Sequence, residues 1–276
     1  MVYNNEQAFL SNYSMLDYDR PSVTADIVAF RIRTEIGDTY RHNGSSNLSV
    51  LLVKRGEYPY KDMWALPGGF LRKDETIEEC AFREIKEETN VAPVSLMPIG
   101  TFSNINRDPR GRIISNGYLS IISDYNCEVR GGTDATDAEW FDIGFVKLAT
   151  GYRLTLTSRD LTLSVELKEL KTIFKKTEFQ VVGKSELAFD HGEIIASAIT
   201  LLRNSARDYD IVFDFLPEQF TLTALQDVVE TIMNISLTAA NFRRKVSEYV
   251  EETEDYVKGA GHRPAKLYKR KLINDN

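Results

Sequence analysis

The sequence contains little cysteine and little histidine. Cys80 and Cys127 lie far apart and outside any CxxC pair, and the three histidines do not cluster. Structural zinc sites need such residues at close spacing, and disulfide-stabilised domains need more cysteines. We therefore expect neither kind of site, and we expect a reducing, cytoplasmic location.

Long apolar runs are also missing. The N-terminal stretch carries acidic and polar residues where a signal peptide would have a continuous apolar core. No apolar run approaches the roughly 20 residues that span a bilayer. These absences predict a cytoplasmic protein without a membrane partner.

Positive charge is not in excess either. The formal net charge is -7, so any binding of nucleic acid would need a local basic patch. The 276 residues are enough for two domains of roughly 100–200 residues each. A hydrophobic content of 42% is ample for packed cores and argues against a disordered or collagen-like chain.

The first half mixes strand and helix signals. Residues 76–89 predict a helix, because Thr76 and Glu79 form a capping box and Asn90 suits a left-handed C-terminal cap. β-Branched and apolar stretches predict strands, and Pro with paired glycines predicts a strand that bends into a loop. These predicted strands are 22–32, 48–53, 64–70, 117–123 and 139–143.

The second half is mainly helical. Apolar residues recur at helical spacing after Asp190, a predicted N-cap, and again in 222–233 and 237–250. A Gly-rich stretch follows and predicts a hairpin. We expect a first domain over 1–160, a connecting segment over 161–189 and a C-terminal domain over 190–276.

Three glutamates fall on one face of the helix at 76–89. Glu84, Glu87 and Glu88 have the spacing i, i+3 and i+4, which clusters their carboxylates. Such a cluster is either a solvated acidic face or a site for a hard cation, Mg²⁺ or Mn²⁺. The flanking residues favour the cation site: Gly69, five residues, Glu75, seven residues, then Arg83-Glu84-Ile85-x-Glu87-Glu88.

This spacing resembles the Nudix hydrolase box, with Asn90 where that family usually has Gly. The resemblance implies an α/β/α sandwich with a mixed sheet, and a metal that neutralises a diphosphate and activates a water. Arg83 would pair with Glu75 or Glu87 and hold the loop to the helix. The base stays open between a box glutamate and a later acid such as Glu128 or Asp134. The implied catalytic residues are Glu75, Arg83, Glu84, Glu87 and Glu88, and the implied metal ligands are Gly68, Glu84, Glu87 and Glu88.

A second segment after the box is dense in arginine. Its DPRGR run resembles the Nudix branch that handles ADP-ribose, and arginine suits phosphate and ribose oxygens. The alternative is a charged surface loop. Phe70, Tyr118 or Trp140 would stack on an adenine or else belong to the core. ADP-ribose is the predicted ligand, with Arg20, Arg55, Arg107, Arg110, Arg112 and Tyr118 as predicted binding residues.

The C-terminal region resembles a DNA-binding domain. A helix, a short connection around Ser236 and a second helix precede a hairpin, and from Ser236 onward there are nine Lys/Arg against six Asp/Glu. A winged helix-turn-helix places its second helix in the major groove. The alternative is a helical packing domain with solvated charges. The predicted DNA-binding residues are Asn241, Arg243, Arg244, Lys245, Arg263, Lys266, Tyr268 and Arg270.

The words NFRRKV and GHRPAKLY resemble the Nudix-related transcriptional regulators. That family implies an α+β chain in which a Nudix domain senses ADP-ribose and a C-terminal winged helix binds double-stranded DNA, as a homodimer, to control genes of NAD metabolism. Two alternatives stay open: a pure ADP-ribose pyrophosphatase with a C-terminal dimerisation module, and a sensor without catalysis. The intact charges of the box favour retained hydrolase activity. A related branch of the family senses sugars, usually with a degraded box, and the intact box argues against that branch.

Overall fold

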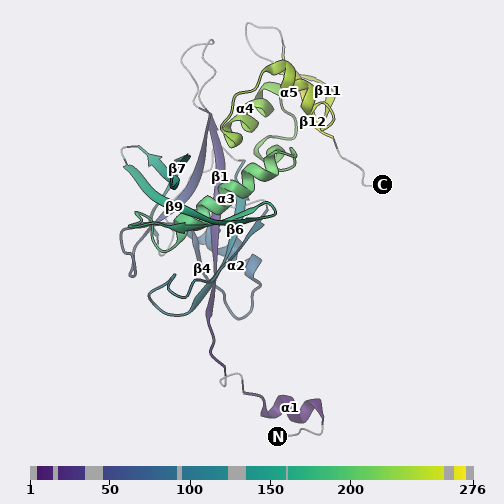
Figure 1. Ribbon diagram of the computed structural model, residues 1–276. Coiled ribbons are helices and arrows are strands. Elements are labelled where there is room, and N and C mark those ends of the chain that lie inside the picture. The colour runs from purple at the N-terminus through teal and green to yellow at the C-terminus, as the bar shows by residue number, and fades with distance from the viewer. Residues whose placement is uncertain are drawn as a thin grey trace.

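Ten strands form one mixed sheet with helices on both faces, and a small helical domain follows it (Figure 1). The computed structural model describes residues 5–14, 18–34, 46–91, 95–123, 135–159, 161–257 and 264–271. Its helices are α1 (Glu6–Asn12), α2 (Ile77–Thr89), α3 (His191–Ala206), the 3-10 helix η2 (Ile211–Phe215), α4 (Leu222–Met233) and α5 (Ala239–Val246).

The strand order of the sheet is β10-β9-β8-β7-β2-β1-β6-β5, while β3 pairs with β2 and β4 pairs with β1. β1 and β6 are parallel, and the other described pairings of the sheet are antiparallel. The predicted mixed sheet is therefore confirmed. Its strands are β1 (Ser22–Thr34), β2 (Ser46–Arg55), β3 (Trp64–Ala65), β4 (Gly68–Phe70), β5 (Met97–Phe102), β6 (Ile113–Ile121), β7 (Ala135–Leu148), β8 (Gly151–Ser158), β9 (Leu161–Ile173) and β10 (Lys176–Val181).

The central strand β1 is apolar on both faces. Ile27 and Ala29 belong to the core cluster that contains α2, whereas Val28 and Phe30 belong to the cluster that contains α3. Successive side chains of a strand point to opposite faces, so this alternation places one helix on each side of the sheet. Each large apolar side chain fully buried in this way stabilises the fold by roughly 1.5–3 kcal/mol.

The helix α2 begins and ends where the sequence predicts. The Thr76 hydroxyl accepts from the Glu79 N–H, the Glu79 carboxylate accepts from the Thr76 N–H, and both halves of the capping box are present. Asn90 ends the helix in the left-handed conformation at φ 59°. These local signals set the register of α2 and hence the direction of its glutamates.

Residues 161–189, predicted as a connecting segment, largely continue the sheet. β9 and β10 extend it by antiparallel pairing, and Leu163, Val165 and Leu167 of β9 are buried. α3 packs into the same core through Ile194 and Ile195, so it belongs to the sheet domain as much as to the domain that follows. The apolar residues of 161–167 alternate with polar ones, which is the pattern of a half-buried strand.

The predicted winged helix is present in the order α4, α5 and a hairpin of β11 (Val250–Tyr256) and β12 (Lys266–Arg270). β12 is tied back to the helices because Tyr268 and Phe220 exchange backbone hydrogen bonds of 2.8 and 2.9 Å. Figure 1 shows this domain beyond the C-terminal end of α3. In the described part of the chain, no helix is long and apolar enough to cross a membrane.

Candidate functional site

The loop at Gly68 and Gly69 packs so closely on its surroundings that a side chain would not fit. A Cβ atom on Gly69 would lie 2.5 Å from the Cδ atom of Glu84, and one on Gly68 would collide with the backbone oxygen of Ala25. The Gly68 N–H donates to Glu88 Oε2 over 2.9 Å. The backbone of this glycine loop is thereby held directly against the carboxylates of α2.

Arg83 fastens the glycine loop to α2 through Glu75. Its Nε and Nη2 atoms donate to the two Glu75 oxygens at 2.9 and 2.6 Å, and Nη2 also donates to the Phe70 carbonyl at 3.2 Å. The hydrogen bonds from Arg83 lower the pKa of Glu75 to about 2, and those to Glu75 raise the pKa of Arg83. The predicted pairing of these two residues is confirmed.

The three predicted metal ligands have unequal surroundings. Glu84 is largely buried, and desolvation raises the pKa of its carboxyl group even though Arg83 Nη1 donates to it at 2.5 Å. Glu88 lines the same cleft as Glu84. Glu87 is 45% exposed and contacts Arg72 and Arg83 at 3.4 and 3.3 Å.

The donor atoms around Glu84 and Glu88 fit a hard divalent cation. Carboxylate oxygens and loop carbonyls are the ligands that Mg²⁺ and Mn²⁺ prefer. The negative charge of Glu87 also helps to raise the pKa of Glu84, and a cation between the carboxylates would offset that repulsion. Among the described residues, no three His, Cys, Asp or Glu side chains are already gathered to hold a metal ion. The full three-glutamate set therefore stays a prediction, and Glu87 would have to leave its arginine partners to complete it.

A cleft of about 410 Å³ opens beside the glycine loop. Of the predicted substrate-binding residues, Arg55, Arg107 and Arg110 line it. The guanidinium carbon of Arg110 lies 5.0 Å from the ring centroid of Phe70 and 5.6 Å from that of Phe189, and Arg55 lies 4.9 Å from Phe189. The aromatic rings of Phe70 and Phe189, with Arg55 and Arg110 against them, thus share the cleft with the glutamates of α2.

Arg107 is a buried ion-pair residue. Its Nε and Nη2 donate to both Asp190 oxygens at 2.9 and 2.7 Å, and Nη2 also donates to Asp26 Oδ2 at 3.1 Å. Ser115 donates to the same Asp26 oxygen at 2.5 Å. Burial alone would lower the pKa of Arg107, but the two aspartates raise it. We call Asp26, Arg107, Ser115 and Asp190 the Arg107 network; it joins β1 to the start of α3.

The described residues that line the cleft do not include Arg20, Arg112 or Tyr118, so the structure does not bring these predicted binding residues to it. Tyr118 is 4% exposed and donates to Glu78 Oε1 at 3.2 Å, and burial raises its pKa to about 12. It is a core residue because it lies on the face of β6 that α2 covers. Arg112 donates instead to the Ser103 carbonyl at 2.7 Å.

Phe189 and His191 also line the cleft, and the sequence analysis missed both. Phe189 has a left-handed φ of 52°, and His191 is 4% exposed. The His191 Nδ1 atom accepts from the Leu66 N–H at 2.8 Å across 125 positions of sequence, and burial lowers the pKa of the imidazole. No local motif marks such a pair, since the contact depends on how α3 docks on the sheet.

The predicted DNA-binding residues Asn241, Arg243, Arg244 and Lys245 are exposed on α5. Within the described residues, its three cations have no ion-pair partner. The opposite side of α5 carries the buried residues Phe242 and Val246. This amphipathic helix therefore presents its positive charge to solvent, as the second helix of a helix-turn-helix must.

The predicted cations of the hairpin have partners within the protein. Lys266 contacts Glu252 at 2.7 Å, and Arg270 contacts Asp210 at 2.5 Å. Tyr268 is partly buried, with its hydroxyl 3.5 Å from Glu252, and Arg263 lies outside the described residues. The hairpin therefore offers less unpaired charge to DNA than its composition suggested.

Two family models match the chain: the NUDIX domain over 39–155 and the NrtR DNA-binding winged helix domain over 212–270. The ADPR responsive transcriptional repressor NtrR of Acinetobacter baylyi is 31% identical over 273 residues, which cover 97% of this chain and 89% of that protein. The chain belongs to the NrtR family. The predicted family and the predicted pairing of a Nudix domain with a winged helix are confirmed.

One further similarity is confined to part of this NrtR-family chain, and another covers most of it. The ADP-ribose pyrophosphatase of Methanocaldococcus jannaschii is 45% identical over 94 residues, 34% of this chain and 54% of that protein. The crystal structure of Shewanella oneidensis NrtR complexed with a 27mer DNA is 26% identical, with a TM-score of 0.56 and coverage of 90% of this chain and 93% of that one. Nudix hydrolases as a class use divalent metal ions.

Proposed function

We propose that this chain is a DNA-binding regulator that responds to ADP-ribose bound in its Nudix cleft. One observation carries the proposal: a glycine-loop cleft and an unpaired cationic helix lie in one chain that aligns over 97% of its length with an ADPR responsive repressor. The regulated genes would be those of NAD metabolism, as the family resemblance implies. Access to DNA requires a cytoplasmic location.

The cleft suits a nucleoside diphosphate joined to a sugar. Its volume of about 410 Å³ falls within the range of small-molecule sites. Arg55 and Arg110 supply guanidinium donors for phosphate or ribose oxygens, and Phe70 and Phe189 supply faces on which a base can stack. The acidic residues of α2 would repel a diphosphate unless a cation lay between them.

We take Mg²⁺ as that cation, with Mn²⁺ as the alternative. Glu84 and Glu88 would hold it, joined by a carbonyl of Gly68 or Gly69 and by Glu87 once that side chain leaves its arginine partners. When bound, the ion neutralises the diphosphate and makes a coordinated water more acidic. Arg83 would hold Glu84 in the same orientation with or without the metal ion, because Arg83 is itself fixed by two hydrogen bonds to Glu75.

Calorimetry with ADP-ribose tests the ligand half of this proposal. Mg²⁺ should strengthen binding, and Glu84→Gln should weaken the Mg²⁺-dependent binding at least about tenfold, since one charged ligand contact is worth roughly 1.5–3 kcal/mol. Glu248→Gln, an exposed acid far along the chain, is the matched control. Equal affinity for ADP-ribose in EDTA and in Mg²⁺ would show that the metal plays no part in binding. No binding under either condition would show that ADP-ribose is not the ligand.

Hydrolysis of ADP-ribose is the second candidate, favoured by the complete set of charged box residues and by the similarity to an ADP-ribose pyrophosphatase in this region. A water oxygen would bond to phosphorus as the anhydride P–O bond breaks, giving AMP and ribose 5-phosphate. The proton of the water would pass to a carboxylate. Glu84, Glu87 and Glu88 are candidates for this base, together with the acids Glu128 and Asp134, which lie outside the described residues.

Release of AMP from ADP-ribose with Mg²⁺ tests the hydrolase candidate. Glu88→Gln should lower the rate more than about 100-fold if that carboxylate stabilises the transition state by ~3 kcal/mol. If the native protein releases no AMP under conditions where ADP-ribose binds, the protein is a sensor without catalytic activity.

DNA binding would use α5 as the helix that enters the major groove. Its exposed Arg243, Arg244 and Lys245 supply phosphate contacts, and Asn241 suits an adenine edge. A homodimer would match a two-fold operator. If the C-terminal domain instead serves only dimerisation, the native protein would not bind DNA from the region upstream of its gene, with or without ADP-ribose.

A further inference from the structure

The cleft is not built by the Nudix domain alone. Phe189 and His191 line it, well beyond residue 155 where the NUDIX match ends, and α3 starts at His191. We propose that α3 transmits ligand occupancy from the cleft to the winged helix, with Phe189 as the residue that senses the occupant. The inference rests on the proposed function, since it concerns how that same cleft acts on α5.

The segment before α3 is bound to the strand that leads into the glycine loop. Leu187 forms a parallel bridge with Trp64, and the Ala188 N–H donates to the Trp64 carbonyl at 2.9 Å. The Leu66 N–H donates to His191 Nδ1 at 2.8 Å, just before Gly68 in the chain. A displacement of the glycine loop around a bound diphosphate would therefore be passed directly to the start of α3.

The Arg107 network makes a second connection between the cleft and α3. Asp190, next to the first residue of α3, takes a two-point hydrogen-bonded pair from Arg107, which also binds Asp26 on β1. All three side chains are less than 10% exposed. Buried pairs of this kind hold one arrangement or another rather than deform gradually, so the start of α3 moves with the cleft wall.

Phe189 is placed to sense what occupies the cleft. Its ring contacts the cations Arg55 and Arg110 at 4.9 and 5.6 Å, and it packs edge-on against Tyr60 at 4.7 Å. Its left-handed backbone is unfavourable for a phenylalanine and persists because the surrounding contacts enforce it. A ligand that draws either arginine onto its phosphates would remove a packing partner of Phe189.

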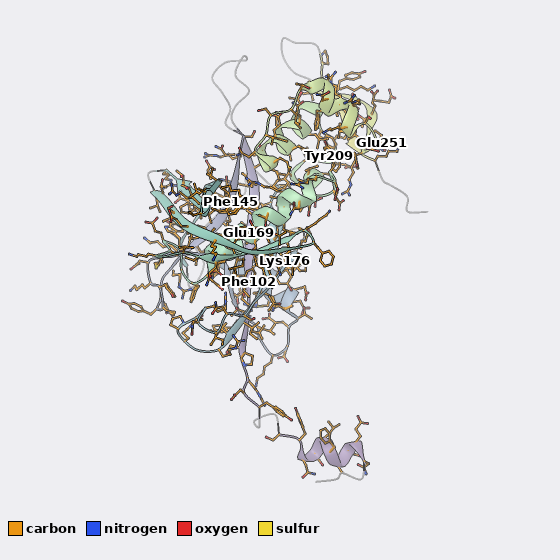
Figure 2. All side chains as sticks on the ribbon, in the orientation of Figure 1. Phe102, Phe145, Glu169, Lys176, Tyr209 and Glu251 are labelled. Carbon is orange, nitrogen blue, oxygen red and sulfur yellow. The ribbon has the colours of Figure 1, made fainter. Side chains whose placement is uncertain are left out.

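The far end of α3 contacts the winged helix. Arg203 Nε donates to the Ile232 carbonyl of α4 at 3.1 Å. Tyr209, labelled in Figure 2 just beyond α3, packs its ring against Phe242 of α5 and Tyr249 at centroid distances of 6.4 and 5.1 Å. With 16 residues, α3 is on the order of 24 Å long and forms one continuous helix between the two sites.

Hydrogen exchange of the native chain gives the first test. Saturating ADP-ribose with Mg²⁺ should change the exchange of amides in 187–195 as well as those of the glycine loop. Changes confined to the glycine loop and α2, with 187–195 unaffected, would overturn the inference. The measurement needs no variant and does not depend on the stability of one.

The second test compares Phe189→Ala with Phe82→Ala, which alters a half-exposed phenylalanine on α2 that does not line the cleft. The readout is the ratio of DNA affinities with and without ADP-ribose, each variant being saturated according to its own measured affinity. Phe189→Ala should bring this ratio closer to 1 by about fivefold or more, the scale of a typical allosteric coupling, whereas Phe82→Ala should leave the ratio as in the native protein. Phe189→Leu keeps an apolar side chain and serves if the alanine variant unfolds.

The outcomes of this second test separate the two proposals. If ADP-ribose does not change the DNA affinity of the native protein, the proposed function itself is refuted. A native protein that responds, together with a Phe189→Ala variant that responds equally, would refute the role of Phe189 and leave the proposed function intact.

Discussion

Of the predicted binding residues Arg55, Arg107 and Arg110, which line the cleft, Arg55 has the most donor capacity left for a ligand. Within the described residues its hydrogen bonding to protein runs through Nε alone, to the Pro59 carbonyl at 2.8 Å, and burial lowers its pKa. Arg110 is held by both Asp108 oxygens and Arg107 by both Asp190 oxygens. The Nη atoms of Arg55 are therefore available to donate to a phosphate.

Arg55→Ala should weaken ADP-ribose binding about tenfold or more, because a charge-assisted hydrogen bond contributes roughly 1.5–3 kcal/mol. Arg112→Ala, which removes an arginine outside the cleft, is the control and should leave binding unchanged. Calorimetry of both variants checks this. Equal losses in the two would mean that arginine charge acts at long range rather than by contact.

The sequence could not separate arginines that lie close together in the chain. Arg107, Arg110 and Arg112 occur within six residues, yet Arg107 and Arg110 line the cleft, the first of them buried in an ion-pair network, and Arg112 bonds to Ser103 away from it. The direction of Arg107 depends on Asp190 and Asp26, which are distant in sequence. Tyr118 was misjudged for the same reason, since α2 covers it.

Among the elements, α2 was predictable and the start of α3 was not. The capping box at Thr76, the left-handed Asn90 and the glutamate spacing are local signals, and each is present in the structure. The contacts of Phe189 and His191 with the cleft depend on tertiary packing. Sequence therefore located the glycine loop and its carboxylates, but not the cleft wall that α3 supplies.

The start of α3 should make stability depend on pH. His191 Nδ1 accepts a hydrogen bond, so its imidazole is neutral when folded, and burial lowers its pKa below 6.5 although Asp26 and Asp190 oppose that shift. Below about pH 6.5 the unfolded chain binds a proton that the folded chain does not, so the free energy of unfolding falls. The loss is about 1.4 kcal/mol per pH unit until the folded pKa is reached.

Urea unfolding between about pH 7.5 and 5.5 measures this loss. His191→Asn keeps an acceptor for the Leu66 N–H without a titrating group, so its stability should fall less over the same range. Identical pH dependence of the two proteins would show that other groups, and not His191, control it.

At the scale of the whole molecule, an acidic chain presents a local cationic surface. The net charge is -7, yet α5 exposes three cations without ion-pair partners among the described residues, whereas Lys269 of β12 contacts Glu251 at 2.9 Å. The order of the two domains was predictable from sequence. The packing of α3 on the sheet was not, since it depends on contacts between residues distant in sequence.

Arg244→Ala should weaken binding to a duplex from the region upstream of the gene and reduce the slope of log affinity against log salt by about 1, because one phosphate contact is lost. Lys269→Ala removes a cation that is already paired and should change the slope less. Fluorescence anisotropy over a range of salt concentrations measures both. A larger effect for Lys269→Ala would assign the DNA contact to the hairpin rather than to α5.

The central claim is that one chain couples an ADP-ribose cleft to a DNA-binding helix. The most direct test is the affinity of the full-length protein for its upstream duplex, measured at constant salt and Mg²⁺ with and without saturating ADP-ribose. The account predicts that ADP-ribose changes this affinity about fivefold or more. Unchanged affinity, in a protein that calorimetry shows to be saturated with ADP-ribose, would contradict it.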